Sequence, residues 1–491
     1  MSTLKGLMEA LRDANINMIG VWGMPGAGKT TLVTEVAKQA KEEKLFEDMA
    51  MAVVVFPNLE TLVLSYIDSE ELPQNQHRAR SSFKLTNIQK KSRFQNLRSL
   101  KVEGSGSLKY LLSSSTARVM EQLKYLSIEN CKVMEEVLLL EDLGEEEEEI
   151  IPNVLFPRLD VLILKDLPIL KRFCVGSNIK FPSLKGMRIE QCPKLKSFIL
   201  KPASSGITVS KEVKEMNSEE ISLTTMQPLF NEEVSFPSLE VLGIYQMENL
   251  KIIWHNQLAE DSFFKLQLLA VQFCENLMNI FQSNMLIRFQ SLEKLFVHDC
   301  GSLQEIFELQ GQDVRETQAV TTIPLKKLDL RRLLKMKQVW NKDPQGIFSF
   351  QNLQEIIVVE CECLKSLFPA NLEEICHGQL PLTSFLNLRI VKVEHCEKLK
   401  FVFSSSIAKG LSQLQELEIR ECSIMGAVAL KEEGGVEDRD MILFPQLRLL
   451  VLHRLPKLMS FLSTQKSIRN DAGEIIPECD LDFHMPILLD Q

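Results

Sequence analysis

Long apolar runs, an excess of positive charge and abundant aromatic residues are all missing from this sequence. No stretch reaches the roughly 20 apolar residues that span a membrane, so we expect no membrane span. The opening segment carries Lys5 and Glu9 among its apolar residues and therefore lacks the uninterrupted apolar core of a secretory signal peptide. We accordingly expect a cytoplasmic protein whose 11 cysteines are free thiols.

The charge balance is acidic, with 56 Lys and Arg against 66 Asp and Glu and a formal net charge of -10. Proteins that bind nucleic acid by charge need clustered Lys and Arg, so no nucleic-acid partner is expected. Aromatic residues make up 7% of the chain, which suits a repeat array better than a compact enzyme. The 7 histidines are scattered, and no Ser/His/Asp arrangement or carboxylate pair predicts a catalytic site.

What the sequence does contain is an internal repeat. The unit reads F-x-x-L-x-x-L-x-(L/I/V)-x-x-C-x-x-L-x-x-(I/V/L/F), a pattern typical of leucine-rich repeats. Thirteen copies begin at Phe56, Phe94, Met120, Phe156, Phe181, Phe236, Phe263, Phe289, Thr322, Phe350, Phe385, Leu411 and Phe444. The repeats therefore predict a solenoid over about residues 56–462, followed by a tail over 463–491.

The repeat pattern also predicts how the solenoid is stabilised. The L-x-(L/I/V) core of each unit alternates apolar and variable residues, so it should form a short strand with both apolar side chains pointing inward. One such strand cannot bury its own apolar side, whereas stacked neighbours can, at about 1.5–3 kcal/mol for each buried Leu or Ile. We expect an α/β horseshoe with parallel strands on its concave side and irregular or helical segments outside.

Seven cysteines occupy one position of the unit, three residues after the last apolar residue of the strand: Cys131, Cys192, Cys274, Cys300, Cys361, Cys396 and Cys422. In leucine-rich repeats this position points inward, and a small thiol fits it. A metal site is the alternative, but successive cysteines lie one or more repeats apart and no CxxC occurs. We expect buried thiols and no zinc.

A different signal precedes the repeats. A short apolar strand over 17–22 leads into Gly23-Met-Pro-Gly-Ala-Gly-Lys-Thr30, which matches G-x-x-x-x-G-K-(S/T), and a helix should follow from about Thr30 to Lys44. Such a loop turns backbone N–H groups toward phosphate oxygens at a helix N-terminus. Lys29 would reach the outer phosphates of a nucleotide, and Thr30 would hold Mg²⁺.

The rest of a nucleotide-hydrolysing domain does not follow this loop. A nucleoside triphosphatase also needs an acidic residue at the end of a second strand, and none occurs before the repeats. After a second strand at Met49 to Val55 the chain passes directly into the first repeat. We therefore expect a truncated strand–helix–strand fragment over residues 1–55, without ATP hydrolysis, and leave nucleotide binding open.

The two parts together resemble plant intracellular disease-resistance receptors of the nucleotide-binding leucine-rich-repeat type, most closely their coiled-coil class. The resemblance rests on Met18-Ile-Gly-Val-Trp-Gly-Met24, Gly28-Lys-Thr-Thr-Leu32, Leu45-Phe-Glu-Asp-Met-Ala-Met-Ala-Val53 and the FP-x-L openings of the repeats. It implies that ADP or ATP with Mg²⁺ binds at the loop, and that the repeats recognise a pathogen effector or a guarded host protein. The nucleotide-binding residues that carry over are Gly23, Gly26, Gly28, Lys29, Thr30 and Thr31.

The sequence also departs from that family. It has no N-terminal coiled coil, no second acidic nucleotide motif, no G-L-P-L-A string and no Met-His-Asp motif. Two functional hypotheses therefore stay open. The chain is either a receptor-like protein with a nucleotide switch, or a non-enzymatic interaction module or decoy whose phosphate loop is vestigial.

Residues that flank the second apolar position of each strand should face the concave side. They are mostly charged at both ends of the array, whereas the middle carries apolar and aromatic side chains. Aromatic anchors concentrate binding energy, so the middle is a candidate partner site; ordinary solvated strand surface is the alternative. The candidate contact residues are Tyr245, Phe296, His298, Ile357 and Val359.

Overall fold

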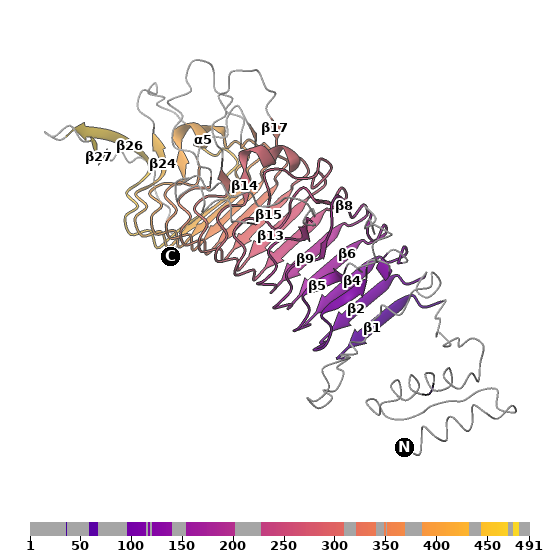
Figure 1. Cartoon of the computed structure of the whole chain (residues 1–491). Coiled ribbons are helices and arrows are strands. Elements are labelled where there is room, and N and C mark those ends of the chain that lie inside the picture. Colours follow the sequence, from indigo (N-terminus) through magenta and orange to yellow (C-terminus); the bar gives the residue numbers. More distant parts are fainter. Residues whose placement is uncertain are drawn as a thin grey trace, which may run out of the picture.

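The computed structural model of the chain is an elongated stack of short strands (Figure 1). The structure describes residue 36 and residues 58–66, 96–113, 116–117, 120–139, 154–201, 227–308, 321–339, 348–349, 351–368, 385–431, 443–469 and 475–480. Of the predicted nucleotide-binding fragment only Val36 is described; it lies in a helix. The phosphate loop itself lies outside the described residues.

One parallel sheet runs through the described part of the chain and contains thirteen strands, each in one predicted unit. Neighbouring strands pair residue for residue, as in the alignment of Leu269 on Leu242. The strands, in spatial order, are β1 (Thr61–Ser65), β2 (Ser99–Glu103), β4 (Tyr125–Glu129), β6 (Val161–Lys165), β9 (Gly186–Glu190), β12 (Val241–Tyr245), β13 (Leu268–Gln272), β15 (Lys294–His298), β18 (Lys327–Arg331), β20 (Glu355–Val359), β21 (Ile390–Glu394), β23 (Glu416–Arg420) and β25 (Leu449–His453).

Each strand has one buried and one open side. In the strands from β2 to β23 the second and fourth residues are buried, as Leu295 and Val297 are in β15. The first, third and fifth residues lie on the other side, which we call the open face of the sheet; it corresponds to the predicted concave face. The predicted leucine-rich-repeat solenoid is therefore confirmed.

The opposite side of the stack contains short parallel strands. They are β3 (Tyr110–Ser113), β5 (Glu136–Leu139), β7 (Cys174–Val175), β8 (Ile179–Lys180), β10 (Ile199–Leu200), β11 (Val234–Ser235), β14 (Phe281–Gln282), β16 (Phe307–Glu308), β17 (Thr321–Thr322), β19 (Phe348–Ser349), β22 (Phe403–Ser404) and β24 (Ala427–Lys431).

Helices are scarce on this side within the described ranges. Apart from residues 116–117, they are the 3-10 helix η2 (Ser283–Arg288) and the helix α5 (Ser405–Gly410). Some units are only 26 residues long, such as the one from Phe263 to Phe289. The strand and two turns take up most of these residues, so few remain to form a helix. The back of the stack is therefore more extended than the predicted α/β arrangement.

Aromatic rings form two columns inside the described part of the stack, one from Phe173 through Trp254 to Phe307 and one from Phe368 to Phe461. Phe181 and Phe236 stack with ring centroids 5.4 Å apart, and Phe281 and Phe307 stack at 5.5 Å. Edge-on contacts, such as Phe173 with Phe181 at 5.5 Å, link the rings from one unit to the next. Such aromatic contacts add about 0.5–1.5 kcal/mol per pair to the burial of the rings, so each unit stabilises its neighbours.

A left-handed turn residue follows every strand of the large sheet. Among them are Gly104 and Asn130, two residue types that tolerate positive φ, but also Gln246 (φ 53°) and Phe273 (φ 56°). The N–H of this residue donates to the last carbonyl of the next strand, as Gly104 does to Glu129 at 2.9 Å. The turn thereby continues the hydrogen-bond ladder of the sheet beyond the strand.

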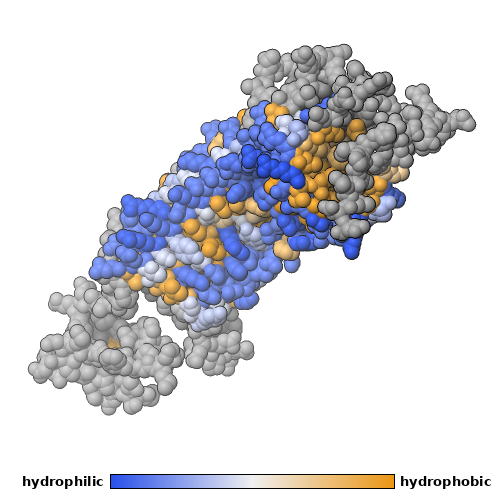
Figure 2. Space-filling view, turned by 180° about the vertical axis from the view of Figure 1, so that it is seen from behind, coloured by the Kyte–Doolittle hydropathy of each residue, from blue (hydrophilic) through white to orange (hydrophobic). Residues whose placement is uncertain are grey.

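The C-terminal end of the stack differs from its middle. The inward residues Leu450 and Leu452 of β25 are 42% and 37% exposed, whereas Leu417 and Ile419 of β23 are fully buried. Figure 2 shows hydrophobic residues gathered toward this end, while most of the remaining visible face is hydrophilic. Two further strands, β26 (Ser460–Arg469) and β27 (Ile475–Asp480), lie at this end, and β26 crosses the predicted boundary at residue 462.

Candidate binding surface on the open face

The six predicted nucleotide-binding residues, Gly23, Gly26, Gly28, Lys29, Thr30 and Thr31, lie outside the described residues. Their role in binding ADP or ATP and the role of Thr30 toward Mg²⁺ stay predictions.

The seven cysteines of the repeat position are buried in the core. Each thiol donates to the carbonyl two residues earlier, over 3.3 Å in Cys131 and Cys192 and 3.6 Å in Cys361. That carbonyl is the last one of the strand, so the cysteine ties the turn to the strand. Burial raises the pKa of both Cys192 and Cys361 to about 12, which keeps these thiols protonated and unreactive.

Cys363, two residues after Cys361, is partly exposed and accepts a hydrogen bond from Lys398 Nζ at 3.5 Å. Within the part of the chain that the structure describes, no three His, Cys, Asp or Glu side chains gather in a way that could hold a metal ion. The same part contains no helix that is both long and apolar enough to cross a membrane.

The predicted contact residues lie in two neighbouring rows across the open face. Tyr245, His298 and Val359 occupy the fifth strand position, and Phe296 and Ile357 the third. All except Ile357 are half-buried. Ile357 is only 8% exposed, between Asp329 and Lys392 in its row, and so offers a partner little surface.

Tyr245 lies flat along the sheet. Its ring covers Gly243, where a Cβ atom would come within 2.5 Å of the ring. The guanidinium of Arg188, from the neighbouring strand β9, lies 4.7 Å from the centroid of the same ring. The absence of a side chain at Gly243 therefore lets an aromatic ring rest on the backbone and meet a cation.

A buried carboxylate anchors the charged groups beside Phe296. The side chain of Asp329 is only 5% exposed and accepts from His298 Nε2 at 3.1 Å and from Arg331 Nε at 2.7 Å. Burial alone would raise the pKa of Asp329, but these two hydrogen bonds outweigh it and lower the pKa to about 2. The carboxylate is therefore ionised at neutral pH and fixes the positions of both partners.

Most of the other charged side chains on the open face form ion pairs with one another. Toward the N-terminal end Lys101 contacts Glu103 at 3.0 Å, and toward the C-terminal end Lys392 contacts Glu418 at 2.8 Å. Between these regions, β12 and β13 carry no charged residue on the open face. We call their six open-face residues the uncharged window: Val241, Gly243, Tyr245, Leu268, Ala270 and Gln272.

Tyr245 is the one member of this window among the predicted contact residues, and the other five were missed. Val241 is 43% exposed and Leu268 is half-buried, and both occupy the first strand position. The sequence reasoning considered only the residues that flank the second apolar position. The strict alternation of the strand was the signal that could have found them, since the first, third and fifth residues share one side.

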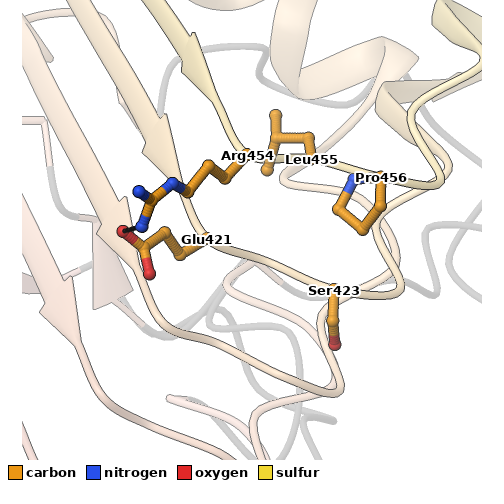
Figure 3. A pocket seen from close by; sticks show the side chains of 5 residues that line it. All are labelled: Glu421, Ser423, Arg454, Leu455 and Pro456. Atoms are coloured by element: carbon orange, nitrogen blue, oxygen red, sulfur yellow. Dashed lines mark hydrogen bonds and ion pairs between the residues drawn. The ribbon is translucent and has the colours of Figure 1, made fainter.

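A shallow hollow lies near the C-terminal end of the stack, at the turns that follow β23 and β25 (Figure 3). Its lining contains the ion pair of Arg454 with Glu421, at 3.2 Å, beside Leu455 and Pro456. The hydroxyl of Ser423 donates to Glu397. The hollow thus combines a solvated ion pair with two apolar side chains and a serine hydroxyl that is hydrogen-bonded to a carboxylate.

Comparison with known protein families gives two matches. The model described as plant disease resistance protein RPS2-like, leucine-rich repeats, matches residues 69–207, 238–372 and 370–469. The model of the NB-ARC domain matches residues 2–94. A probable disease resistance protein of Arabidopsis thaliana is 27% identical over 154 residues, which are 31% of this chain and 15% of that relative. The matched region thus spans only a small part of the relative.

Solved structures with similarity to the chain include a leucine-rich-repeat protein of Leptospira interrogans. It is 15% identical, with 74% of this chain and 85% of that chain covered and a TM-score of 0.24. The plant peptide hormone receptor RGFR1, in complex with RGF2, is 12% identical over 81% of this chain and 80% of its own, with a TM-score of 0.14.

Proposed function

Because the chain belongs to the plant disease resistance proteins with RPS2-like leucine-rich repeats, preceded by an NB-ARC segment, we propose that its open face binds a protein in the defence response. The partner would be a pathogen effector or a guarded host protein, met in the cytoplasm. The uncharged window carries this proposal. Most charged groups elsewhere on the open face pair with one another, whereas the window offers apolar and aromatic surface without ion pairs to break.

The neighbouring residues suit a protein partner. Phe296 follows the window on β15, and Tyr245 is held in place by Gly243 and Arg188. Strands lie about 4.8 Å apart, so the five strands from β12 to β20 span roughly 20 Å, enough for a protein segment. Aromatic side chains with fixed orientations lose little entropy on binding and make good anchors.

Differential capture from plant extract tests this surface. Immobilised chain is compared with the variant Phe296→Glu and with the matched variant Phe264→Glu, at a partly exposed phenylalanine outside the sheet. We expect at least one protein that the unmodified chain and Phe264→Glu both retain and that Phe296→Glu loses by about tenfold or more. Equal retention by all three would place the contact away from the open face.

For the N-terminal segment we propose binding of ADP or ATP without hydrolysis. The NB-ARC match supports nucleotide binding in general. Gly23, Gly26 and Gly28 would cradle the phosphates, Lys29 would neutralise them, and Thr30 and Thr31 would contact Mg²⁺ and phosphate oxygen. Titration with ADP-Mg by calorimetry should show affinity that Lys29→Ala removes.

The second candidate function is an interaction module or decoy with a vestigial phosphate loop. The lack of a second acidic motif before the repeats favours it. The same titration separates the two candidates, since a vestigial loop binds no nucleotide either before or after the substitution. The open face would bind its partner in both cases.

A further inference from the structure

The Lys and Arg side chains of the open face differ in whether a carboxylate already holds them. Seven of the eight on the described strands form an ion pair: Lys101, Lys165, Arg188, Lys327, Arg331, Lys392 and Arg420. The eighth is Lys294, the first residue of β15, whose side chain is exposed and has no carboxylate partner among the described residues. Its ammonium group is therefore free to bind another molecule.

The register of the sheet explains why Lys294 stays unpaired. Its neighbours in the row of first strand positions are Leu268 on one side and Lys327 on the other. Lys327 pairs with the next residue of the row, Glu355, at 2.9 Å. Glu293, which precedes Lys294 in the chain, is paired with another lysine at 2.7 Å. Both neighbouring carboxylates are thus engaged elsewhere.

The middle of the open face therefore carries an excess of positive charge. The five strands from β12 to β20 place Lys294, Lys327 and Arg331 on this face against Asp329 and Glu355. The open face of the strands from β1 to β9 carries equal numbers of both signs, and acidic residues are in excess from β21 to β25. A local positive charge on a chain of net charge -10 favours an acidic partner at this place.

The free lysine also borders the apolar part of the face. Leu268 of the uncharged window lies beside it on β13, and Phe296 follows two residues later on the same side of β15. Neighbouring strands are about 4.8 Å apart, so one partner segment reaches the ammonium group and the window together. A carboxylate that approached Lys327 or Arg331 would instead compete with the acid that already holds each of them.

We propose that the partner segment carries an Asp or Glu next to apolar or aromatic residues, and that Lys294 binds this carboxylate while the uncharged window and Phe296 receive the apolar side chains. The inference rests on the proposed binding of a protein at the open face and adds the chemistry of the segment that binds. The apolar surroundings exclude water around the ion pair and so strengthen it, whereas a basic segment would meet uncompensated positive charge.

Selection from a displayed library of random peptides tests this chemistry. The library is selected on the immobilised full chain, on Lys294→Glu and on the control Lys251→Glu, which makes the same charge change at an exposed lysine outside the strands. We expect peptides with Asp or Glu beside apolar residues on the unmodified chain and on Lys251→Glu. On Lys294→Glu the acidic preference should be lost or replaced by Lys and Arg.

A selected acidic peptide then measures the contact itself. Lys294→Met keeps the apolar stem and removes the charge, so it should weaken this peptide by about fivefold or more. The same peptide with Asn or Gln in place of the acid should bind the unmodified chain and Lys294→Met equally. Fluorescence anisotropy gives the four affinities, and an equal loss for both peptides on Lys294→Met would contradict a contact with the carboxylate.

The variant Phe296→Glu separates this inference from the function on which it rests. Peptides that Phe296→Glu loses but that show no acidic preference, or keep the same preference on Lys294→Glu, would overturn the role of Lys294 and leave the open face as the binding surface. If no selected peptide depends on Phe296, the proposed binding at the open face fails as well.

Discussion

The ring of Tyr245 rests on the backbone of Gly243, where any Cβ atom would collide with it at 2.5 Å. The relationship is local to one strand, yet it decides how the middle of the open face is shaped. It holds the ring parallel to the sheet and under Arg188, beside the uncharged window. A side chain at residue 243 would turn the tyrosine outward.

Gly243→Ala should therefore lower the free energy of unfolding, by about 0.5–1 kcal/mol, through loss of the contact between Tyr245 and Arg188. Gly186→Ala is the matched control, because a Cβ there meets only Val161, at 3.8 Å. An alanine in that open position should be neutral or slightly stabilising. Urea denaturation of both variants checks the difference, and equal effects would show that the tyrosine is not held as described.

Acid should lower the free energy of unfolding of the chain because Asp329 becomes protonated. Its pKa is lowered to about 2 in the folded chain from an ordinary value of 3.8, so its stabilisation is complete above about pH 4 and is lost as the pH falls toward 2. The contribution at neutral pH is about 2 kcal/mol. Asp329→Asn should remove it, so the stability difference from the unmodified chain should shrink between pH 5 and pH 2.

Urea midpoints measured across that range give this comparison directly. Other carboxyl groups with lowered pKa, such as Glu190 and Glu418, titrate in both chains and cancel in the difference. A difference that stays constant with pH would mean that Asp329 is not the group responsible.

The buried Cys361 and the partly exposed Cys363 should differ in their reactivity toward an alkylating reagent. At pH 8 iodoacetamide should label Cys363 of the native chain more than about tenfold faster than Cys361, whose thiol is buried and has a pKa near 12. The two lie on one peptide, so mass spectrometry compares them in the same molecule. Labelling in urea, where both cysteines should react equally, serves as the control. Similar labelling rates for Cys361 and Cys363 in the native chain would contradict the burial of the repeat cysteines.

The turn after each strand offers a stabilising substitution. Gln246 is exposed, has a φ of 53° and makes its ladder contact through its backbone N–H alone. Gln246→Gly should relieve the left-handed strain and raise the free energy of unfolding by about 0.5 kcal/mol, after the entropic cost of glycine. Gln272→Gly, at the end of a regular strand, should instead lower it. Thermal melts of both variants test the pair.

Much of this fold follows from the sequence because the repeat fixes it. The positions of Leu295, Val297 and Cys300 were predictable, since each unit must hide the same side chains from water. The turn at Gln246 was not, because a glutamine carries no sign of positive φ; only the stacking of neighbours imposes it. The sequence also left open whether the back of the stack is irregular or helical, and the short units decide this because they leave little room for helices.

The candidate surface was only partly predictable for a related reason. Tyr245 and Phe296 stand where alternation placed them, but the exposure of a side chain on the open face also depends on the strands beside it. Ile357 is covered among its row neighbours, whereas Val241 is left open. Sequence alternation gives the side of the sheet on which a residue lies, while the register decides which residues a partner can reach.

Site-specific photo-cross-linking tests the open face most directly. A photoreactive phenylalanine is placed at Val241 in the uncharged window, or at Leu334, which is 47% exposed at a turn outside the strands. In plant extract the probe at position 241 should give a discrete adduct with a protein, and the probe at position 334 should not. The same adduct from both probes, or from position 334 alone, would contradict the open face as the binding surface.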